Sequence, residues 1–262
     1  GGGGGGFNGG SNGDGGSGGS GVVILSYTPS TAVVATPALN SDALPVTSGL
    51  FARYRAADYD TANKIWWDSS GNSYDVPASS ITGTPTTPTV SANSNGVSKS
   101  FAVVQGTTAD AITFPSSVLP STYTLFHIAR YTGGTNRRII NSATATNWLS
   151  GFWSGANGVA FHNGWMTQYS TATHGNNWIL SSDQNTLYRS NGVQRGNSGY
   201  GSPNYTQLGI NAGSPYGAES SDFQVAEIIV YNTTLTPAQI RQVESYLTVK
   251  YGLLGTNNAG TN

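Results

Sequence analysis

Hydrophobic and polar residues follow each other in the second half of the chain in patterns that predict β-strands. Residues 122–131 (TYTLFHIARY) are apolar on both odd and even positions, as in a strand that is covered on both faces. Residues 187–196 (LYRSNGVQRG) hold two short strand-like runs separated by Asn191 and Gly192. This pair predicts a β-hairpin, because a type I′ turn requires positive φ at both positions.

A third strand is predicted at 223–231 (FQVAEIIVY), where apolar residues again dominate. Its acidic residue, Glu227, is either a catalytic carboxylate on a sheet or part of a structural closing element. Regular alternation places five side chains on one face of this strand: Phe223, Val225, Glu227, Ile229 and Tyr231.

An amphipathic helix is predicted at 237–251, directly after this strand. Thr236 is suited to the N-cap, Pro237 to the first helical position and Gln239 to the third, which together form a capping box. Gly252 is suited to end the helix. The helix is expected to cover an end or edge of the sheets with the apolar residues that recur at helical spacing: Ile240, Val243, Leu247 and Tyr251.

The chain divides by composition into four segments. Residues 1–27 are glycine-rich and end in a strand-like run; they are either a flexible linker or packed extended glycine helices. Residues 28–47 contain three prolines and predict an extended connector. The main domain is expected at 48–254, and 255–262 form a polar tail.

Charge and cysteine content narrow the class of protein. Only 9% of the 262 residues are charged, and the net charge is -1, so neither nucleic acid nor anionic lipid is favoured as a partner. The absence of cysteine excludes disulfides and thiolate metal sites. The longest aliphatic run is only 22–25, so membrane insertion is not expected. A surface rich in Ser, Thr, Asn and Gly is typical of virion-surface, extracellular and cell-surface β-proteins.

Several segments together resemble the concanavalin A-like, laminin-G-like jelly-roll superfamily. They are 48–59 (SGLFARYRAADY), 66–75 (WWDSSGNSYD), 207–213 (QLGINAG) and the closing segment 223–253. The resemblance covers roughly 48–254 and implies an all-β fold: an antiparallel two-sheet jelly-roll sandwich with one C-terminal amphipathic helix. The glycine-rich N-terminal segment resembles fibre-type modules of phages and large viruses.

The acidic residues do not form the pattern of glycosidases on this fold. Retaining glycosidases need two carboxyl groups roughly 5 to 5.5 Å apart. The chain has three glutamates, and no acidic residue lies two to four positions from Glu227. The sequence therefore predicts a protein that is not an enzyme, in which Glu227 pairs with Arg53 or Arg55. An atypical glycan-active enzyme stays an alternative.

The jelly-roll resemblance implies binding of carbohydrate or protein partners, and residues 147–169 hold the densest group of suitable side chains. Sugars stack on exposed aromatic rings while polar side chains bind their hydroxyls. Some of these aromatic residues, Trp153 above all, are equally suited to a core. The candidate ligand-binding residues are Trp148, Trp153, His162, Asn163, Trp165, Tyr169 and Arg137. A second candidate surface comprises Arg137, Arg138 and the loop 197–205 with Tyr200 and Tyr205.

One further motif suggests a cation. Asp68, Asn72 and Asp75 offer oxygen ligands for Ca²⁺, but the same residues are also what a tight turn requires. No other cofactor is expected.

These observations favour a non-enzymatic carbohydrate- or receptor-binding module of a viral or phage fibre or of a bacterial surface adhesin. Its partners would be a glycan or cell-surface receptor, together with other virion or surface subunits or copies of itself. The alternative is a structural fibre or capsid-decoration subunit that binds no ligand.

Overall fold

The computed structural model describes residues 42–169, 172–197, 207–212 and 219–254. The glycine-rich segment 1–27, most of the connector and the polar tail 255–262 lie outside these residues, as do Tyr200 and Tyr205. None of the helices in the described part is long and apolar enough to cross a membrane.

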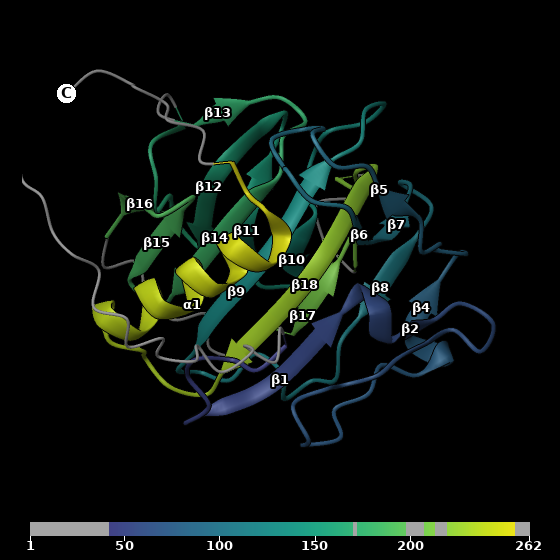
Figure 1. The fold of residues 1–262 in the computed structure, drawn as a ribbon, viewed down its shortest axis with the longest axis horizontal. Coiled ribbons are helices and arrows are strands. Elements are labelled where there is room, and N and C mark those ends of the chain that lie inside the picture. Colours follow the sequence, from purple (N-terminus) through teal and green to yellow (C-terminus); the bar gives the residue numbers. More distant parts are fainter. Residues whose placement is uncertain (1–41, 170–171, 198–206, 213–218, 255–262) are drawn as a thin grey trace, which may run out of the picture. The chain divides into compact units, whose positions relative to one another are not determined.

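Two antiparallel sheets face each other (Figure 1). The first has the order β1-β18-β9-β14-β15-β16, with β7 also paired to β18, and the second the order β13-β12-β11-β10-β17-β8-β4. The strands of the first sheet are β1 (Leu50–Arg55), β7 (Val104–Gly106), β9 (Thr124–Tyr131), β14 (Ile179–Gln184), β15 (Leu187–Ser190), β16 (Val193–Gly196) and β18 (Phe223–Tyr231). Those of the second are β4 (Ile81–Thr82), β8 (Ala111–Thr113), β10 (Ile140–Ser142), β11 (Trp148–Trp153), β12 (Ala156–His162), β13 (Thr173–His174) and β17 (Leu208–Ile210).

The remaining strands and the 3₁₀-helices are short and lie outside the two large sheets. Two small sheets pair β2 (Tyr59–Asp60) with β3 (Ile65–Trp66) and β5 (Thr89–Val90) with β6 (Phe101–Ala102). Two 3₁₀-helices span Ala56–Asp58 and Ala78–Ser80. The predicted hairpin is confirmed, since Asn191 and Gly192 join β15 to β16 with φ of 47° and 76°.

The main core lies between the two large sheets. Leu125, Ala129 and Tyr131 of β9 face Trp148 and Phe152 of β11 across it. The other side of β9 is also apolar and buried, which confirms the prediction of a strand covered on both faces. The molecule is therefore a mainly β sandwich with one C-terminal α-helix in its described part.

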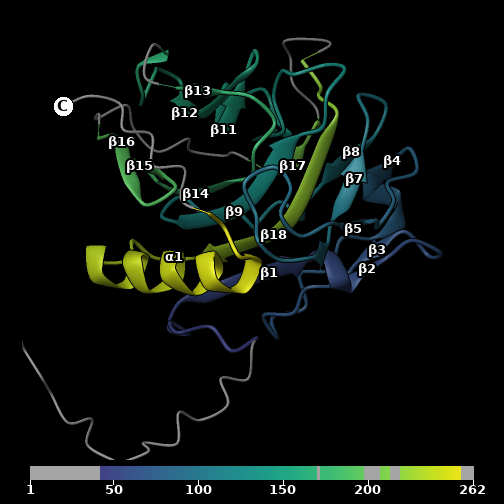
Figure 2. The same ribbon diagram turned by 45° about the horizontal axis from the view of Figure 1, so that its top comes forward.

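The helix α1 (Pro237–Tyr251) begins and ends as the sequence predicts. The Thr236 side chain accepts the Gln239 N–H, the reciprocal half of the capping box is present, and Gly252 ends the helix in the left-handed conformation. Its location differs from the prediction. The helix lies on the outer face of the first sheet, not on an end or edge (Figures 1 and 2). That face is apolar, and the helix shields its side chains from water. The side chains of this second core include Phe126, Ile128, Leu180, Ile229, Ile240, Val243 and Leu247.

The prediction that alternate residues of 223–231 share one face is wrong. The pairing of β18 with β9 shifts register between Val225 and Glu227. Phe223 and Val225 consequently lie in the core between the sheets, whereas Ile229 and Tyr231 lie in the core beneath the helix. A β-bulge of this kind reverses the alternation that follows it.

The compact unit begins at Asp42, within the predicted connector, and not at Ser48. Leu44 and Val46 are buried in the core beneath the helix, and the Tyr231 hydroxyl donates to the Val46 carbonyl at 2.8 Å. Apolar residues just before the first strand thus extend the domain.

Candidate functional site

Strands β11 and β12 divide the aromatic residues of 147–169 between two environments. Trp148 and His162 are fully buried between the sheets, with ring centroids 5.8 Å apart. The Trp148 indole donates to the Tyr123 hydroxyl at 3.2 Å, and His162 Nε2 lies 3.1 Å from Asp183 Oδ1. Trp148 and His162 therefore belong to the core, which corrects their assignment as ligand-binding residues.

On the outer face of the second sheet, Trp153, Phe161, Trp165 and Tyr169 form one group of contacting rings, the aromatic cluster. Trp165 is central: its ring centroid lies 5.2 Å from that of Phe161, 6.5 Å from that of Trp153 and 6.3 Å from that of Tyr169. Trp165 is 38% exposed and Tyr169 is 42% exposed, whereas Trp153 and Phe161 are half-buried. Three of the sequence-predicted residues are thus brought together at the surface.

A tight turn places Trp165 in this cluster. Asn163 has φ of 56°, a left-handed conformation that Asn tolerates better than most residues, and is exposed. The His162 N–H donates to the Gly164 carbonyl at 2.8 Å, and Trp165 then pairs with Phe161. The Asn163-Gly164 turn therefore folds the chain back so that Trp165 lies against β12, and it leaves Asn163 exposed.

A buried cation supports the cluster from one side. The guanidinium of Arg138, which is 5% exposed, lies 5.0 Å from the Trp153 ring centroid. Its Nε lies 2.6 Å from Glu219 Oε2, and its Nη1 donates to Asn147 Oδ1 at 2.9 Å. Arg137 is exposed, while its backbone N–H donates to the Ser221 hydroxyl at 2.6 Å. Arg138 thus fixes the ring of Trp153. Arg137, the preceding residue, is exposed.

The cluster continues into a polar hollow. The Tyr169 ring lies 6.0 Å from the ring of His174, which is exposed on β13. His174 also lines a hollow of about 90 Å³ together with Asn157, Thr173 and Asn177. Exposed rings, an imidazole and side-chain amides are therefore adjacent on one surface.

The carboxylate of Glu227 lies on the opposite side of the sandwich, beneath α1, and is 1% exposed. It accepts from Arg53 Nε at 2.7 Å, from Lys250 Nζ at 2.8 Å and from the Tyr251 hydroxyl at 2.6 Å. The predicted pairing of Glu227 with Arg53 is confirmed; Arg55, the alternative partner, pairs with Asp58 and Asp42.

The turn at 68–75 uses its polar groups internally. Asp68 accepts backbone N–H bonds from Arg53, Ser70 and Tyr74, and Asp75 accepts one from Asp68. Asn72 presents its amide nitrogen, not its oxygen, to the carbonyls of Leu50 and Phe51. This arrangement is the turn that the sequence offers as the alternative to a Ca²⁺ site. Within the described ranges, no three His, Asp or Glu side chains are grouped so that they could hold a metal ion.

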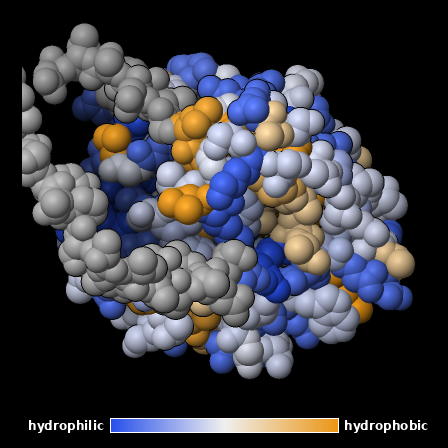
Figure 3. All heavy atoms as spheres, viewed as in Figure 1, coloured by the Kyte–Doolittle hydropathy of each residue, from blue (hydrophilic) through white to orange (hydrophobic). Residues whose placement is uncertain are grey.

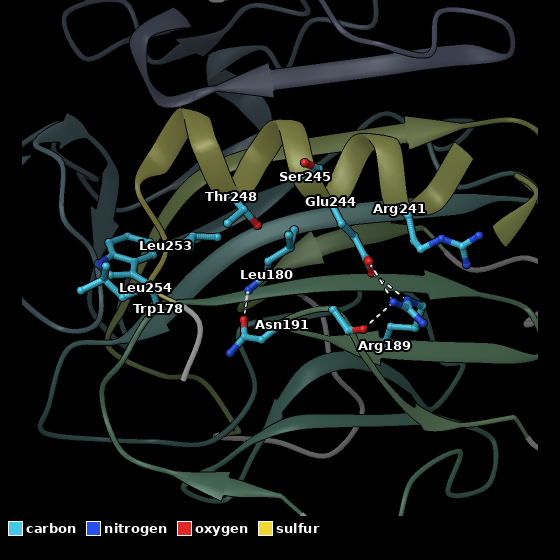
Figure 4. Close-up of a pocket in the computed structure, with 11 residues that line it drawn as sticks. Trp178, Leu180, Arg189, Asn191, Arg241, Glu244, Ser245, Thr248, Leu253 and Leu254 are labelled. Carbon is cyan, nitrogen blue, oxygen red and sulfur yellow. Dashed lines mark hydrogen bonds and ion pairs between the residues drawn. The ribbon is translucent and has the colours of Figure 1, made fainter. Parts of the chain in front are cut away.

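The structure also contains a groove that the sequence does not indicate, between α1 and the β14–β15 hairpin (Figure 4). Its volume is about 370 Å³. The residues that line it are distributed over 178–192 and 241–254, so that no local motif reveals them. They include Trp178, Leu180, Arg189, Arg241, Glu244 and Thr248.

No protein-family model and no curated protein matches the sequence. The fold is similar to domain 4 of AbnA, a GH43 extracellular arabinanase from Geobacillus stearothermophilus solved in complex with arabinotriose. The identity is 14%, the TM-score is 0.53, and the match covers 75% of this chain and 98% of that domain. This likeness shows a shared β-sandwich fold.

Two more distant similarities extend over part of larger chains. One is to a Trypanosoma rangeli sialidase in complex with the inhibitor DANA, at 11% identity and a TM-score of 0.47, covering 77% of this chain and 33% of that chain. The other is to the binding domain of Botulinum Neurotoxin DC in complex with SialylT, at 9% identity and a TM-score of 0.48, covering 77% of this chain and 52% of that chain.

Proposed function

We propose that the chain is a non-enzymatic carbohydrate-binding module and that the aromatic cluster is its binding surface. The observation that carries the proposal is the group of Trp165 and Tyr169, two exposed rings held by half-buried ones. A pyranose presents an apolar C–H face that stacks on such rings, and neighbouring amides bind its hydroxyls. His174, whose ring lies 6.0 Å from that of Tyr169, supplies a polar group at the cluster, and the exposed Asn163 lies two positions before Trp165 in the chain.

The shared fold supports this function, because the arabinanase domain of similar fold was solved with a bound oligosaccharide. The proposal includes the finer features expected from the sequence. These are the concanavalin A-like jelly-roll connectivity and a role outside the cell or on a virion, as part of a fibre or adhesin that contacts a glycan receptor.

The environment of the glutamates supports a binding role in place of catalysis. Glu219, Glu227 and Glu244 each form an ion pair with an arginine, to Arg138, Arg53 and Arg189 respectively. Glycoside hydrolysis requires one carboxyl group to act as an acid and another as a base or nucleophile at the sugar. Carboxylates whose oxygens are already engaged by arginines of the same domain are poorly placed to act on a bound sugar.

A glycan array probed with the full chain, followed by calorimetric titration of the best glycan, tests the proposal. Trp165→Ala is expected to weaken binding by about 1 to 3 kcal/mol, by analogy with bases stacked on aromatic side chains, with little change in the melting temperature. Trp67→Ala is the matched control, because Trp67 is 47% exposed but lies outside the aromatic cluster. Equal affinity of both variants, or the absence of any bound glycan, would favour the structural-subunit alternative.

A further inference from the structure

The groove between α1 and the β14–β15 hairpin, here the helix groove, has the dimensions of a small-ligand site. Its volume of about 370 Å³ falls in the range of roughly 300–1,000 Å³ that is usual for such sites. The side chains of Arg241 and Thr248 mark its length along the helix, about 10 Å at 1.5 Å per residue.

One end of the helix groove carries a positive charge without a counter-ion. Glu244 pairs with Arg189, from which it accepts bonds of 2.8 and 2.9 Å. Arg241 lies at the same end (Figure 4), and among the described residues it has neither an ion-pair nor a hydrogen-bond partner. Since the lining contains no further acidic residue, this end attracts an anionic group.

The other end is less charged and contains Trp178, Leu253 and Leu254 together with the polar Asn191. Leu180 and Trp178 are almost fully buried there, while Leu253 and Leu254 border the opening. Figure 4 shows Trp178, Leu253 and Leu254 together at the end opposite Arg241. The groove is thus amphipathic along its length.

Two observations decide between ligand classes. Trp178 is only 3% exposed and contacts Phe101 and Arg130, so the helix groove presents no aromatic face on which a sugar could stack. On the visible part of the helix face, hydrophobic residues form small separate spots on a mainly hydrophilic surface (Figure 3). A broad protein interface would require a larger continuous apolar patch.

We propose that the helix groove binds a small amphipathic carboxylate, such as a medium-chain fatty acid. Its carboxylate contacts Arg241, and its aliphatic chain lies against Leu253 and Leu254, which border the opening. This site is separate from the aromatic cluster, which lies on the outer face of the other sheet.

Titration of the full chain with hexanoate, octanoate and octanol, followed by calorimetry and by NMR shifts of the groove residues, tests the site. Octanoate is expected to bind about fifteenfold more tightly than hexanoate, because each of its two additional methylenes contributes about fourfold when buried. Arg241→Gln is expected to weaken octanoate about threefold to fivefold and to leave octanol unchanged. Arg195→Gln removes the same charge outside the groove and is expected to change neither.

A second pair of variants tests the location. Thr248→Trp fills the groove and is expected to weaken octanoate at least about tenfold, whereas Val249→Trp, at the adjacent exposed position, is expected to have no effect. Melting curves identify any variant that unfolds. The proposal would be overturned if octanoate did not bind. It would also be overturned if Thr248→Trp and Val249→Trp, or Arg241→Gln and Arg195→Gln, changed the octanoate affinity equally. Glycan binding is measured on the same samples, so that failure of one site is distinguished from failure of the other.

Discussion

At the scale of single residues, Glu227 joins three parts of the chain that are distant in sequence. It contacts Arg53 of the first strand, and Lys250 and Tyr251 of the last turn of the helix. Burial and the neighbouring carboxylate together raise the pKa of Tyr251 well above its ordinary value, so the tyrosine stays a neutral donor. The contacts of Glu227 with Arg53, Lys250 and Tyr251 therefore hold the helix against the first sheet.

Replacement of this carboxylate should therefore affect stability. We expect Glu227→Gln to lower the free energy of unfolding by about 3 to 5 kcal/mol, because it leaves the buried Arg53 with only the half-exposed Asp42, at 3.4 Å, as counter-ion. Urea unfolding measures the effect, with Asp60→Asn, at the half-buried end of β2, as the matched change of charge. Glycan binding should persist, since the aromatic cluster lies on the other sheet; loss of binding in a folded variant would assign Glu227 a direct role.

His127 predicts how stability depends on pH. Burial lowers the pKa of this imidazole from its ordinary value of 6.5 to about 3. The unfolded chain therefore takes up a proton below pH 6.5 that the folded chain takes up only near pH 3. Stability should fall with decreasing pH in this window, by about 1.4 kcal/mol per pH unit from this residue.

Denaturant unfolding at several pH values between 7 and 4 measures the slope. His127→Gln retains a polar group for the hydroxyl of Ser150, which lies 3.0 Å from His127 Nε2, but it removes the titration. The variant is expected to be less stable at pH 7 and to show a flatter pH dependence. An unchanged slope would mean that other groups cause the acid sensitivity.

At the scale of elements, the helix is held by its apolar face. Leu247 is 1% exposed, and Leu247→Asp would place a charge in the core beneath the helix. We expect a loss of stability beyond the about 2 to 5 kcal/mol that removal of a buried leucine alone costs. Val249→Asp, at a position of the same helix that is 64% exposed, is the control. Similar melting temperatures of the two variants would contradict the observed packing.

The turn at 68–75 gives a prediction about calcium. Because Asp68 already accepts three backbone N–H bonds, neither Ca²⁺ nor a chelator should shift the melting temperature. Asp68→Ala should cost about 1.5 to 3 kcal/mol through the loss of bonds to a charged acceptor. A calcium-dependent rise in melting temperature that Asp68→Ala abolishes would favour the cation interpretation instead.

Elements encoded by local signals could be predicted from the sequence. The helix has its caps within a few residues of its ends, and the Asn191-Gly192 hairpin requires only two. The two faces of β18 could not be predicted, because a bulge depends on the neighbouring strand and not on the strand's own alternation. The helix position likewise depends on which face of a distant sheet is apolar.

The candidate site was predictable in part for the same reason. The segment 147–169 does supply the exposed rings, but sequence alone does not reveal which tryptophans point inward. Trp148 faces the core and Trp153 the surface, as their odd spacing on one strand requires, but this spacing does not say which of the two points inward. The support from Arg138 and Glu219, and the whole helix groove, depend on contacts between distant segments.

At the scale of the whole domain, three layers follow each other: the helix, the first sheet and the second sheet (Figure 2). The helix groove belongs to the helix layer, whereas the aromatic cluster lies on the outer face of the second sheet. The two proposed ligands are therefore expected on different layers, although the helix groove and the polar hollow beside the cluster share Trp178 and Asn191 in their linings.

The layer order also determines where the domain can be tethered. Asp42 contacts Lys250 at 2.9 Å, and Leu254 borders the helix groove, so both ends of the described domain are on the helix layer. Among the described residues, the aromatic cluster therefore lies on the face away from both of these ends. Several copies displayed side by side could consequently engage one glycan-covered surface together, and even a weak single-site affinity would then add up to strong avidity.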